Sequence, residues 1–396
     1  MPEATSILSS LEKERSGIFI LRNDVNYTII KDTQALAHVC EKARLAQVVM
    51  LDTEFVRTRT YHPQLGLIQL FDGEQLVLID PLEIDNMDSF AELLQDQSVM
   101  KILHACGEDL EVFQHSFGCI PNPMIDTQLM AAFLGHGLST GFAALVNEYL
   151  SVELDKSESR ADWLARPLTD KQLDYAAADV YYLLPLYQQL LEEVESKGWL
   201  EAVQQESTLL ISKRLKTVDA NNAFLDVKGA WTLNSEQLAI LKVIAKWRLL
   251  EAQKRDLALN FIVKEANMLE ICRLKMTSLK QMNEAGFDHR EIRRHGNTLI
   301  DLVKQGVATP KSEWPDKITR LMDDPTYKQL FKRLKDEVKA VSESTGLATE
   351  FLASKKQLNQ FISWVWLDDR SESNLPDVMR DWRKDILGEI LNKQMK

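Results

Sequence analysis

The sequence places two acidic side chains directly after an apolar segment. Val48–Asp52 predicts a buried strand, and Glu54 follows two positions after Asp52. Side chains two positions apart on a strand share a face, so both carboxylates are expected to point the same way. Two adjacent like charges are stable beside a cation, and oxygen ligands suit Mg²⁺ or Mn²⁺. The alternative is that the two acids simply begin a solvated loop.

A second group of acids lies where an expected strand, Met100–His104, passes into an expected helix, Gly107–Ser116. The first turn of this helix contains Glu108, Asp109 and Glu111. Acids at a helix N-terminus are stabilised by the helix dipole whatever their function. Position alone therefore does not choose among the three.

A third pair consists of Tyr175 and Asp179, within a helix expected over Thr169–Ser196. Residues four positions apart on a helix are neighbours, so the phenol and the carboxylate share a face. The three alanines between them keep the helix thin and allow a metal ion, a substrate or another element to approach closely. The alternative is an ordinary surface pair.

The elements that would carry these residues alternate between strands and helices, which predicts a mixed sheet flanked by helices. The other expected strands are Leu65–Phe71 and Leu76–Ile79, and the other expected helices are Ser89–Leu94, Thr127–Leu134 and Phe142–Leu150. Thr169 and Gln172 predict a capping box, and Pro185 is expected to kink the long helix or to end its first half.

The chain beyond this region has no strand signals. Two helical domains are expected at residues 231–307 and 316–391, joined by the proline-containing segment 308–315. Their apolar positions repeat weakly at an offset of 89 residues. The expected organisation is therefore an N-terminal extension (1–26), an α/β domain (27–207), a linker (208–230) and the two helical domains.

The length and composition of the chain indicate its broad class of protein. The chain has 396 residues, 45% hydrophobic and 27% charged, which is typical of a soluble globular protein of several domains. No apolar run approaches the length of a membrane helix, and four scattered cysteines suit a reducing cytoplasm. The net charge is −17 for residues 1–200 and +5 for residues 201–396. An acidic α/β domain can bind a polyanion such as nucleic acid if bound metal ions offset its negative charge. The mildly basic second half is expected to hold the nucleic acid.

Taken together, the three acidic segments resemble the motifs of the DEDD exonucleases, in the branch with a tyrosine in the last motif. Asp52-Thr53-Glu54 resembles the first motif, Asp109 the second, and Tyr175-x-x-x-Asp179 the third. The helical domains resemble paired HRDC domains. Further similarity to one member of this branch extends over Arg57–Leu70, Asp162–Leu168 and Arg255–Leu269, and the resemblance covers residue 27 to the end.

The resemblance implies a ribonuclease H-like fold followed by two all-α HRDC-like domains. It also implies a 3′→5′ exoribonuclease with two divalent ions, Mg²⁺ or Mn²⁺, that releases 5′-mononucleotides and trims precursor tRNA and other small structured RNAs. By the family pattern, Asp52 bridges the ions, Glu54 and Asp179 hold the ion beside the attacking water, and Asp109 supports the second ion. Tyr175 orients the water.

Less specific candidates are expected along the path of the terminal nucleotides. These substrate-binding candidates are Thr53, Arg57, Leu65, Gln69 and Arg166. Lysines and arginines of the helical domains offer phosphate contacts. No obligate protein partner is evident.

The competing hypotheses are a DNA exonuclease of proofreading type and a non-catalytic nucleic-acid-binding protein. A helicase is not expected, despite the HRDC resemblance, because the sequence contains no G-x-x-x-x-G-K-[ST] phosphate loop.

Overall fold

The computed structural model describes residues 25–215, 219–368 and 370–395. Nearly all of the expected N-terminal extension lies outside these residues. The chain forms two compact units. The first contains the described residues up to Glu54 together with Gly66–Cys106 and Pro121–Val203, and the second contains Phe55–Leu65, Gly107–Ile120 and the described residues from Gln204 onward.

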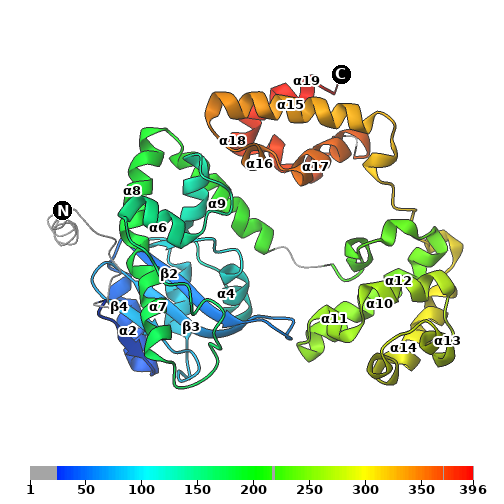
Figure 1. Ribbon diagram of the computed structural model, residues 1–396, viewed down its shortest axis with the longest axis horizontal. Coiled ribbons are helices and arrows are strands. Elements are labelled where there is room, and N and C mark those ends of the chain that lie inside the picture. Colours follow the sequence, from blue (N-terminus) through cyan, green and yellow to red (C-terminus); the bar gives the residue numbers. More distant parts are fainter. Residues whose placement is uncertain (1–24, 216–218, 369, 396) are drawn as a thin grey trace. The chain divides into compact units, whose positions relative to one another are not determined.

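A six-stranded mixed sheet forms the centre of the α/β domain, in the order β1-β4-β3-β2-β5-β6. Strand β1 is parallel to β4, β2 is parallel to β5 and β5 is parallel to β6, whereas β3 is antiparallel to β4. The strands are β1 (Thr28–Ile30), β2 (Val48–Val56), β3 (Gln64–Phe71), β4 (Leu76–Ile79), β5 (Met100–Leu103) and β6 (Met124–Asp126). The expected mixed sheet flanked by helices is confirmed (Figure 1).

Strand β2 is longer than the sequence predicted. It continues through Asp52 and Glu54 to Val56 instead of ending at Asp52. Phe55 and Val56 supply the aromatic and β-branched side chains that favour an extended backbone, so the strand persists beyond the acids. The two carboxylates consequently project from a regular strand, which fixes their common direction more firmly than a loop would.

Helix α7 (Asp170–Tyr181) begins at the capping box that the sequence predicted. The Thr169 hydroxyl accepts from the Gln172 backbone N–H at 3.2 Å, and Gln172 Oε1 accepts from the Thr169 backbone N–H at 3.0 Å. The helix ends one residue before Tyr182, after which α8 (Leu183–Ser196) begins. Pro185 explains the break, because it offers no N–H to the carbonyl of Tyr181 four residues earlier.

The other helices of this region are α2 (Thr33–Ala43), α3 (Asp88–Gln95), α4 (Asp109–Phe117), α5 (Thr127–Phe133), α6 (Phe142–Leu150) and α9 (Leu200–Arg214). In the first unit α2 packs against α3, α7 packs against β4, and α8 packs against β5. Helix α9 continues across the domain limit expected at residue 207, up to Arg214.

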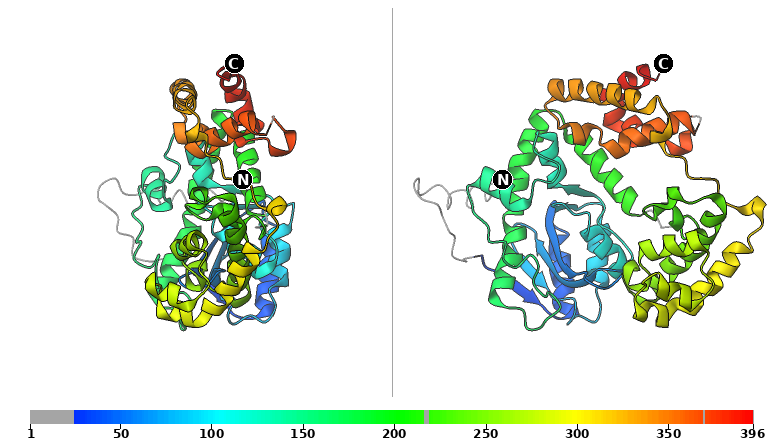
Figure 2. Two further views of the ribbon diagram at one scale, coloured as in Figure 1. Left: turned by 90° about the vertical axis from the view of Figure 1, so that its right-hand side faces the viewer. Right: turned by 45° about the vertical axis from the view of Figure 1, so that its right-hand side comes forward.

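The first helical domain contains α10 (Ser235–Arg255), α11 (Leu259–Ile262), α12 (Glu265–Leu274), α13 (Leu279–Glu284) and α14 (His289–Val307). Helices α10 and α14 lie side by side (Figures 1 and 2). Gly306 permits this close approach, because a Cβ there would lie 2.5 Å from the Ile240 Cα. Buried apolar side chains from these helices form one core, which includes Ile244, Met268 and Val303.

The second helical domain repeats the order of elements of the first. Helices α15 (Tyr327–Thr345), α16 (Thr349–Leu352) and α17 (Lys355–Trp366) follow one another as α10, α11 and α12 do. Leu352 and Phe361, two of the repeated apolar positions, are fully buried. The weak sequence repeat therefore corresponds to a structural one. No described helix is both long and apolar enough to cross a membrane.

Two segments that belong to the α/β domain in sequence contact the helical domains within the second unit. In the segment Phe55–Leu65, the Arg59 carbonyl accepts from the Ala258 N–H at 2.8 Å, and the His62 N–H donates to Asp256 Oδ1 at 2.9 Å. Tyr61 packs against the core of the first helical domain. Glu206 of α9 pairs with Arg383, and the Trp382 indole N–H donates to Glu206 at 3.0 Å.

Candidate active site

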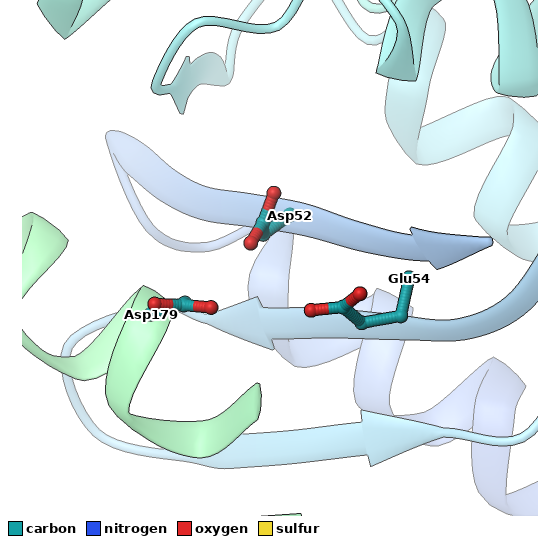
Figure 3. Close-up of side chains that lie close together, drawn as sticks. All are labelled: Asp52, Glu54 and Asp179. Atoms are coloured by element: carbon teal, nitrogen blue, oxygen red, sulfur yellow. The ribbon is translucent and has the colours of Figure 1, made fainter. Parts of the chain in front are cut away.

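Three carboxylates from two elements form the centre of the candidate site. Asp52 and Glu54 come from β2, and Asp179 comes from α7 (Figure 3). One carboxylate oxygen of each lies within 4.8 Å of one oxygen of each of the other two. Residues far apart in the sequence thus bring three hard oxygen ligands together, at a spacing that a divalent cation can bridge.

Tyr175 lies beside this group on the same face of α7. Its hydroxyl is hydrogen-bonded to the Asp179 carboxylate. Burial raises the pKa of the Tyr175 phenol, and the charges of Asp179, Glu54 and Asp52 raise it further. The phenol therefore stays protonated at neutral pH, and it can donate a hydrogen bond but cannot act as a base.

Burial determines the electrostatics of the Asp179 carboxyl. Burial raises the pKa of its carboxyl above the usual range, and the hydrogen bond from Tyr175 only partly offsets this effect. In this environment the ionised form is unfavourable without a cation nearby. The donor set and its electrostatics therefore both fit a bound divalent ion.

Helix α7 can carry these side chains close to the sheet because the residues between them are small. Ala176 and Ala177 are fully buried. A larger side chain at either position would move the helix away from its neighbours, since no space is left around it. The Trp163 ring, also buried, lies 6.1 Å from the Tyr175 ring between centroids and helps to hold the phenol.

The structure distinguishes the three acids that the sequence left equivalent at the start of α4. Glu108 is exposed, whereas Asp109 is only 7% exposed. Glu111 is engaged by two arginines, at 2.8 Å from Arg57 Nη1 and 3.4 Å from Arg214 Nη1. Asp109 belongs to the second compact unit, and the group of three carboxylates does not include it.

Asp126 is a buried acid that sequence reasoning missed. Its carboxylate accepts from the backbone N–H groups of Ala105, Cys106 and Gln128, at 2.8–3.0 Å. Ala105 adopts a positive φ of 54°, which is unusual for a residue other than glycine. Asp126 thus holds the turn that follows β5. The sequence did contain a feature that could have identified Asp126, because an aspartate between an apolar strand and a helix is typical of an N-cap.

Most of the substrate-binding candidates are engaged within the protein. The Thr53 side chain is buried and points to the opposite face of β2 from Asp52 and Glu54. Arg57 pairs with Glu111 and donates to the Tyr61 carbonyl at 2.7 Å.

The remaining three candidates differ in their surroundings. Arg166 donates to both Asp80 oxygens at 2.7 Å and to the Gly66 carbonyl at 2.6 Å, and its role in substrate binding stays a prediction. Gln69 is fully buried, and its amide has no hydrogen-bond partner among the described residues. Leu65 is partly exposed and stays a prediction.

Comparison with protein-family models matches three segments of the chain. A 3′-5′ exonuclease model matches residues 27–195, an HRDC domain model matches residues 237–303, and a model described as "Ribonuclease D, C-terminal HRDC domain" matches residues 325–391. These ranges lie inside the expected α/β and helical domains.

Several relatives match nearly the whole chain, including the following two. Ribonuclease D of Serratia proteamaculans (strain 568) is 48% identical over 372 residues, which cover 94% of this chain and all of the relative. The chain belongs to the ribonuclease D family. Ribonuclease D of Escherichia coli (strain K12) is 46% identical over 94% of this chain and 99% of its own length.

A solved structure agrees with this assignment. The crystal structure of Escherichia coli RNase D, described as an exoribonuclease involved in structured RNA processing, matches with a TM-score of 0.91 and 47% identity. The match covers 93% of this chain and 98% of that one. The resemblance to the tyrosine-bearing DEDD exonucleases with HRDC domains is therefore confirmed, and the protein is a hydrolase of the 3′→5′ exoribonuclease class.

Proposed function

We propose that the protein removes nucleotides one at a time from RNA 3′ ends and releases 5′-mononucleotides, using two divalent ions. The observation that carries the proposal is the convergence of Asp52, Glu54 and Asp179 within 4.8 Å of one another. Asp109 completes the ligand set by the family pattern. Mg²⁺ and Mn²⁺ both suit an all-carboxylate set.

The chain's own residues divide the work. By the family pattern Asp52 would hold both ions, and its neighbours Glu54 and Asp179 would hold the one beside the attacking water. When bound, the ions neutralise charge at the scissile phosphate and lower the pKa of a water molecule. The single O–H of Tyr175 donates to Asp179, so its oxygen accepts a hydrogen bond from the attacking water and fixes the direction of that water. Asp179 accepts the Tyr175 hydrogen bond and thereby fixes the phenol.

We propose that the substrates are the 3′ extensions of precursor tRNA and other small structured RNAs. The Escherichia coli relative is described as involved in structured RNA processing, which supports this choice. The helical domains hold the body of the RNA, and residues 201–396 carry the excess of basic side chains that such a role requires.

The proposal is tested with the Asp52→Ala variant and a 3′-extended tRNA. We expect mononucleotide release to be lost in the variant and, for the unchanged protein, in excess EDTA, while affinity for the RNA is kept. A DNA oligonucleotide of the same sequence serves as the competing substrate. Full activity in the variant or in EDTA contradicts the metal mechanism, and a preference for DNA contradicts the choice of substrate.

A further inference from the structure

A groove on the first helical domain lies outside the candidate active site and has a volume of about 560 Å³. One wall is a face of α10, and the other consists of part of α14 and the segment Thr309–Pro315 that follows it. This volume is within the range of about 300–1,000 Å³ that small-molecule sites occupy. It is large enough for a nucleotide.

The floor of the groove is apolar and contains an aromatic ring. Val243, Trp247 and Leu250 line it from α10, and Leu302 and Pro315 line it from the other side. Trp247 is only partly buried, and it packs against the domain core. Leu250 is 47% exposed. An apolar floor with an accessible indole is a surface on which a flat base can stack.

The Trp247 ring is held in place by a contact with the His295 ring. Its centroid lies 5.4 Å from that of the His295 ring, in an edge-to-face arrangement. His295 is 6% exposed, so the contact lies inside the domain. A ring that is already ordered loses little conformational freedom when a ligand stacks on it.

The rim of the groove is basic. Lys242, Lys246 and Lys254 line it from α10, at spacings of four and eight residues that place them along one helix face. Among the described residues none of the three forms an ion pair, although Lys246 donates to Asn221 at 2.9 Å. Of the two acids in the lining, Glu251 is paired with Arg255 at 3.5 Å. The other acid is Glu313, so three lysines outnumber two glutamates and leave the groove a net positive charge for a phosphate backbone.

We infer that this groove binds an unpaired nucleotide of the RNA substrate, with the base stacked on Trp247 and the neighbouring phosphates at Lys242 and Lys246. The inference deepens the proposed function and rests on it. The combination of an aromatic floor and a cationic rim favours single-stranded nucleic acid over an apolar peptide, which would gain nothing from the lysines.

The test measures RNA binding by the full chain in EDTA, which prevents degradation. The ligand is a single-stranded RNA of about twelve nucleotides, a length that such a groove and its flanking surfaces can bind. We expect Trp247→Ala to weaken binding about tenfold and Trp247→Phe to weaken it much less. Lys242→Ala/Lys246→Ala should lower the slope of log affinity against log salt by about 1.4, the value for two single-strand phosphate contacts.

The matched control is Lys280→Ala/Lys304→Ala, which removes the same charge from the same domain outside the groove lining. Equal losses in the two double variants, or unchanged binding in Trp247→Ala, would overturn the inference. A photoreactive thiouridine in the RNA gives a second readout, and we expect a cross-link within α10. Absence of that cross-link, with cross-links elsewhere in the chain, also contradicts the inference.

A dinucleotide separates this inference from the proposed function. Hydrolysis of the dinucleotide by the unchanged protein with Mg²⁺ reports on the active site, whereas RNA binding in EDTA reports on the groove. Failure of the unchanged protein to hydrolyse it would count against the proposed function alone, because binding in EDTA does not depend on hydrolysis.

Discussion

At the scale of single residues, the site brings three acidic side chains together. Asp52, Glu54 and Asp179 are held together by a strand and a helix, which also stabilise the fold. Because burial disfavours the ionised form of Asp179, the metal-free folded state is less stable at a pH where this carboxyl is ionised.

The pKa of Asp179 leads to a prediction for the metal-free protein. Because its folded pKa is raised above the unfolded value, ionisation disfavours the folded state at pH values above the unfolded pKa. Asp179→Asn should therefore raise the melting temperature in EDTA at pH 8, and the gain should shrink as the pH falls towards 4. Thermal unfolding at several pH values measures this effect. A lower melting temperature in the variant at pH 8 would contradict it.

Tyr175 offers a second prediction at this scale. In Tyr175→Phe the ring still packs beside Trp163, but the hydrogen bond that orients the water is lost. We expect kcat to fall about a hundredfold, the cost of a mispositioned reactant, while metal affinity and KM change little. Single-turnover hydrolysis and metal titration separate these effects. An unchanged kcat would show that the phenol has no positioning role.

The sequence supports the residues of the site unequally. Asp52 and Glu54 could be predicted from physics, because paired acids on an apolar strand require a cation. Tyr175 and Asp179 alone are weak evidence of function, because a surface pair on a helix has the same spacing. Only together with the other two motifs do they indicate an active site. The ion pairs that hold Glu111 and Arg166 could not be predicted, since they join residues 54 or more positions apart, and only the folded chain brings these together.

At the scale of elements, the turn between β5 and α4 depends on one buried carboxylate. Asp126 accepts three backbone N–H groups, and the turn contains the positive φ of Ala105. This turn leads directly to Asp109 at the start of α4. Asp126 therefore fixes the backbone immediately before α4.

We expect Asp126→Ala to lower the free energy of unfolding by about 2–3 kcal/mol, because it leaves buried N–H groups without a partner. Asp126→Asn, which keeps one acceptor oxygen, should lose less. Urea denaturation with bound Mg²⁺ measures both variants. Equal stability of the alanine variant and the unchanged protein would show that water or another group replaces the carboxylate.

The elements were predicted well where the local sequence determines them. The capping box of α7, the strand β4 and the helix α6 lie where the sequence placed them. Strands β1 and β6 are three residues each, too short for a periodic signal, and only their neighbours in the sheet stabilise them. Helix α2 was also missed, although its Asp32 cap was visible in the sequence.

At the scale of the whole molecule, one buried ion pair joins α9 to the C-terminal helical domain. Arg383 is 3% exposed, pairs with Glu206 and donates to the carbonyls of Phe351 and Leu352. Its guanidinium also lies 4.3 Å from the centre of the Trp382 ring. The charge of Glu206 is what makes a guanidinium acceptable at this depth.

Glu206→Gln should destabilise the C-terminal domain by about 3–5 kcal/mol, because it leaves a buried charge without its partner. Amide hydrogen exchange of residues 327–393 measures the stability of this domain alone. Global unfolding is less suitable because it averages over several domains. The control is Glu389→Gln, whose pair with Lys393 is solvent-exposed and contributes little. Unchanged exchange in Glu206→Gln would contradict a structural role for the pair.

The segment Phe55–Leu65 has a consequence for how this chain can be recombined with its relatives. It follows the first acidic motif without interruption, yet its backbone is hydrogen-bonded to the first helical domain at Ala258 and Asp256. A chimaera joined only in the linker after α9 would pair this segment with a foreign surface. We therefore expect a transplanted helical domain to fold correctly only when residues 55–65 are exchanged together with it. The unit to be exchanged is thus encoded by two separate stretches of the gene.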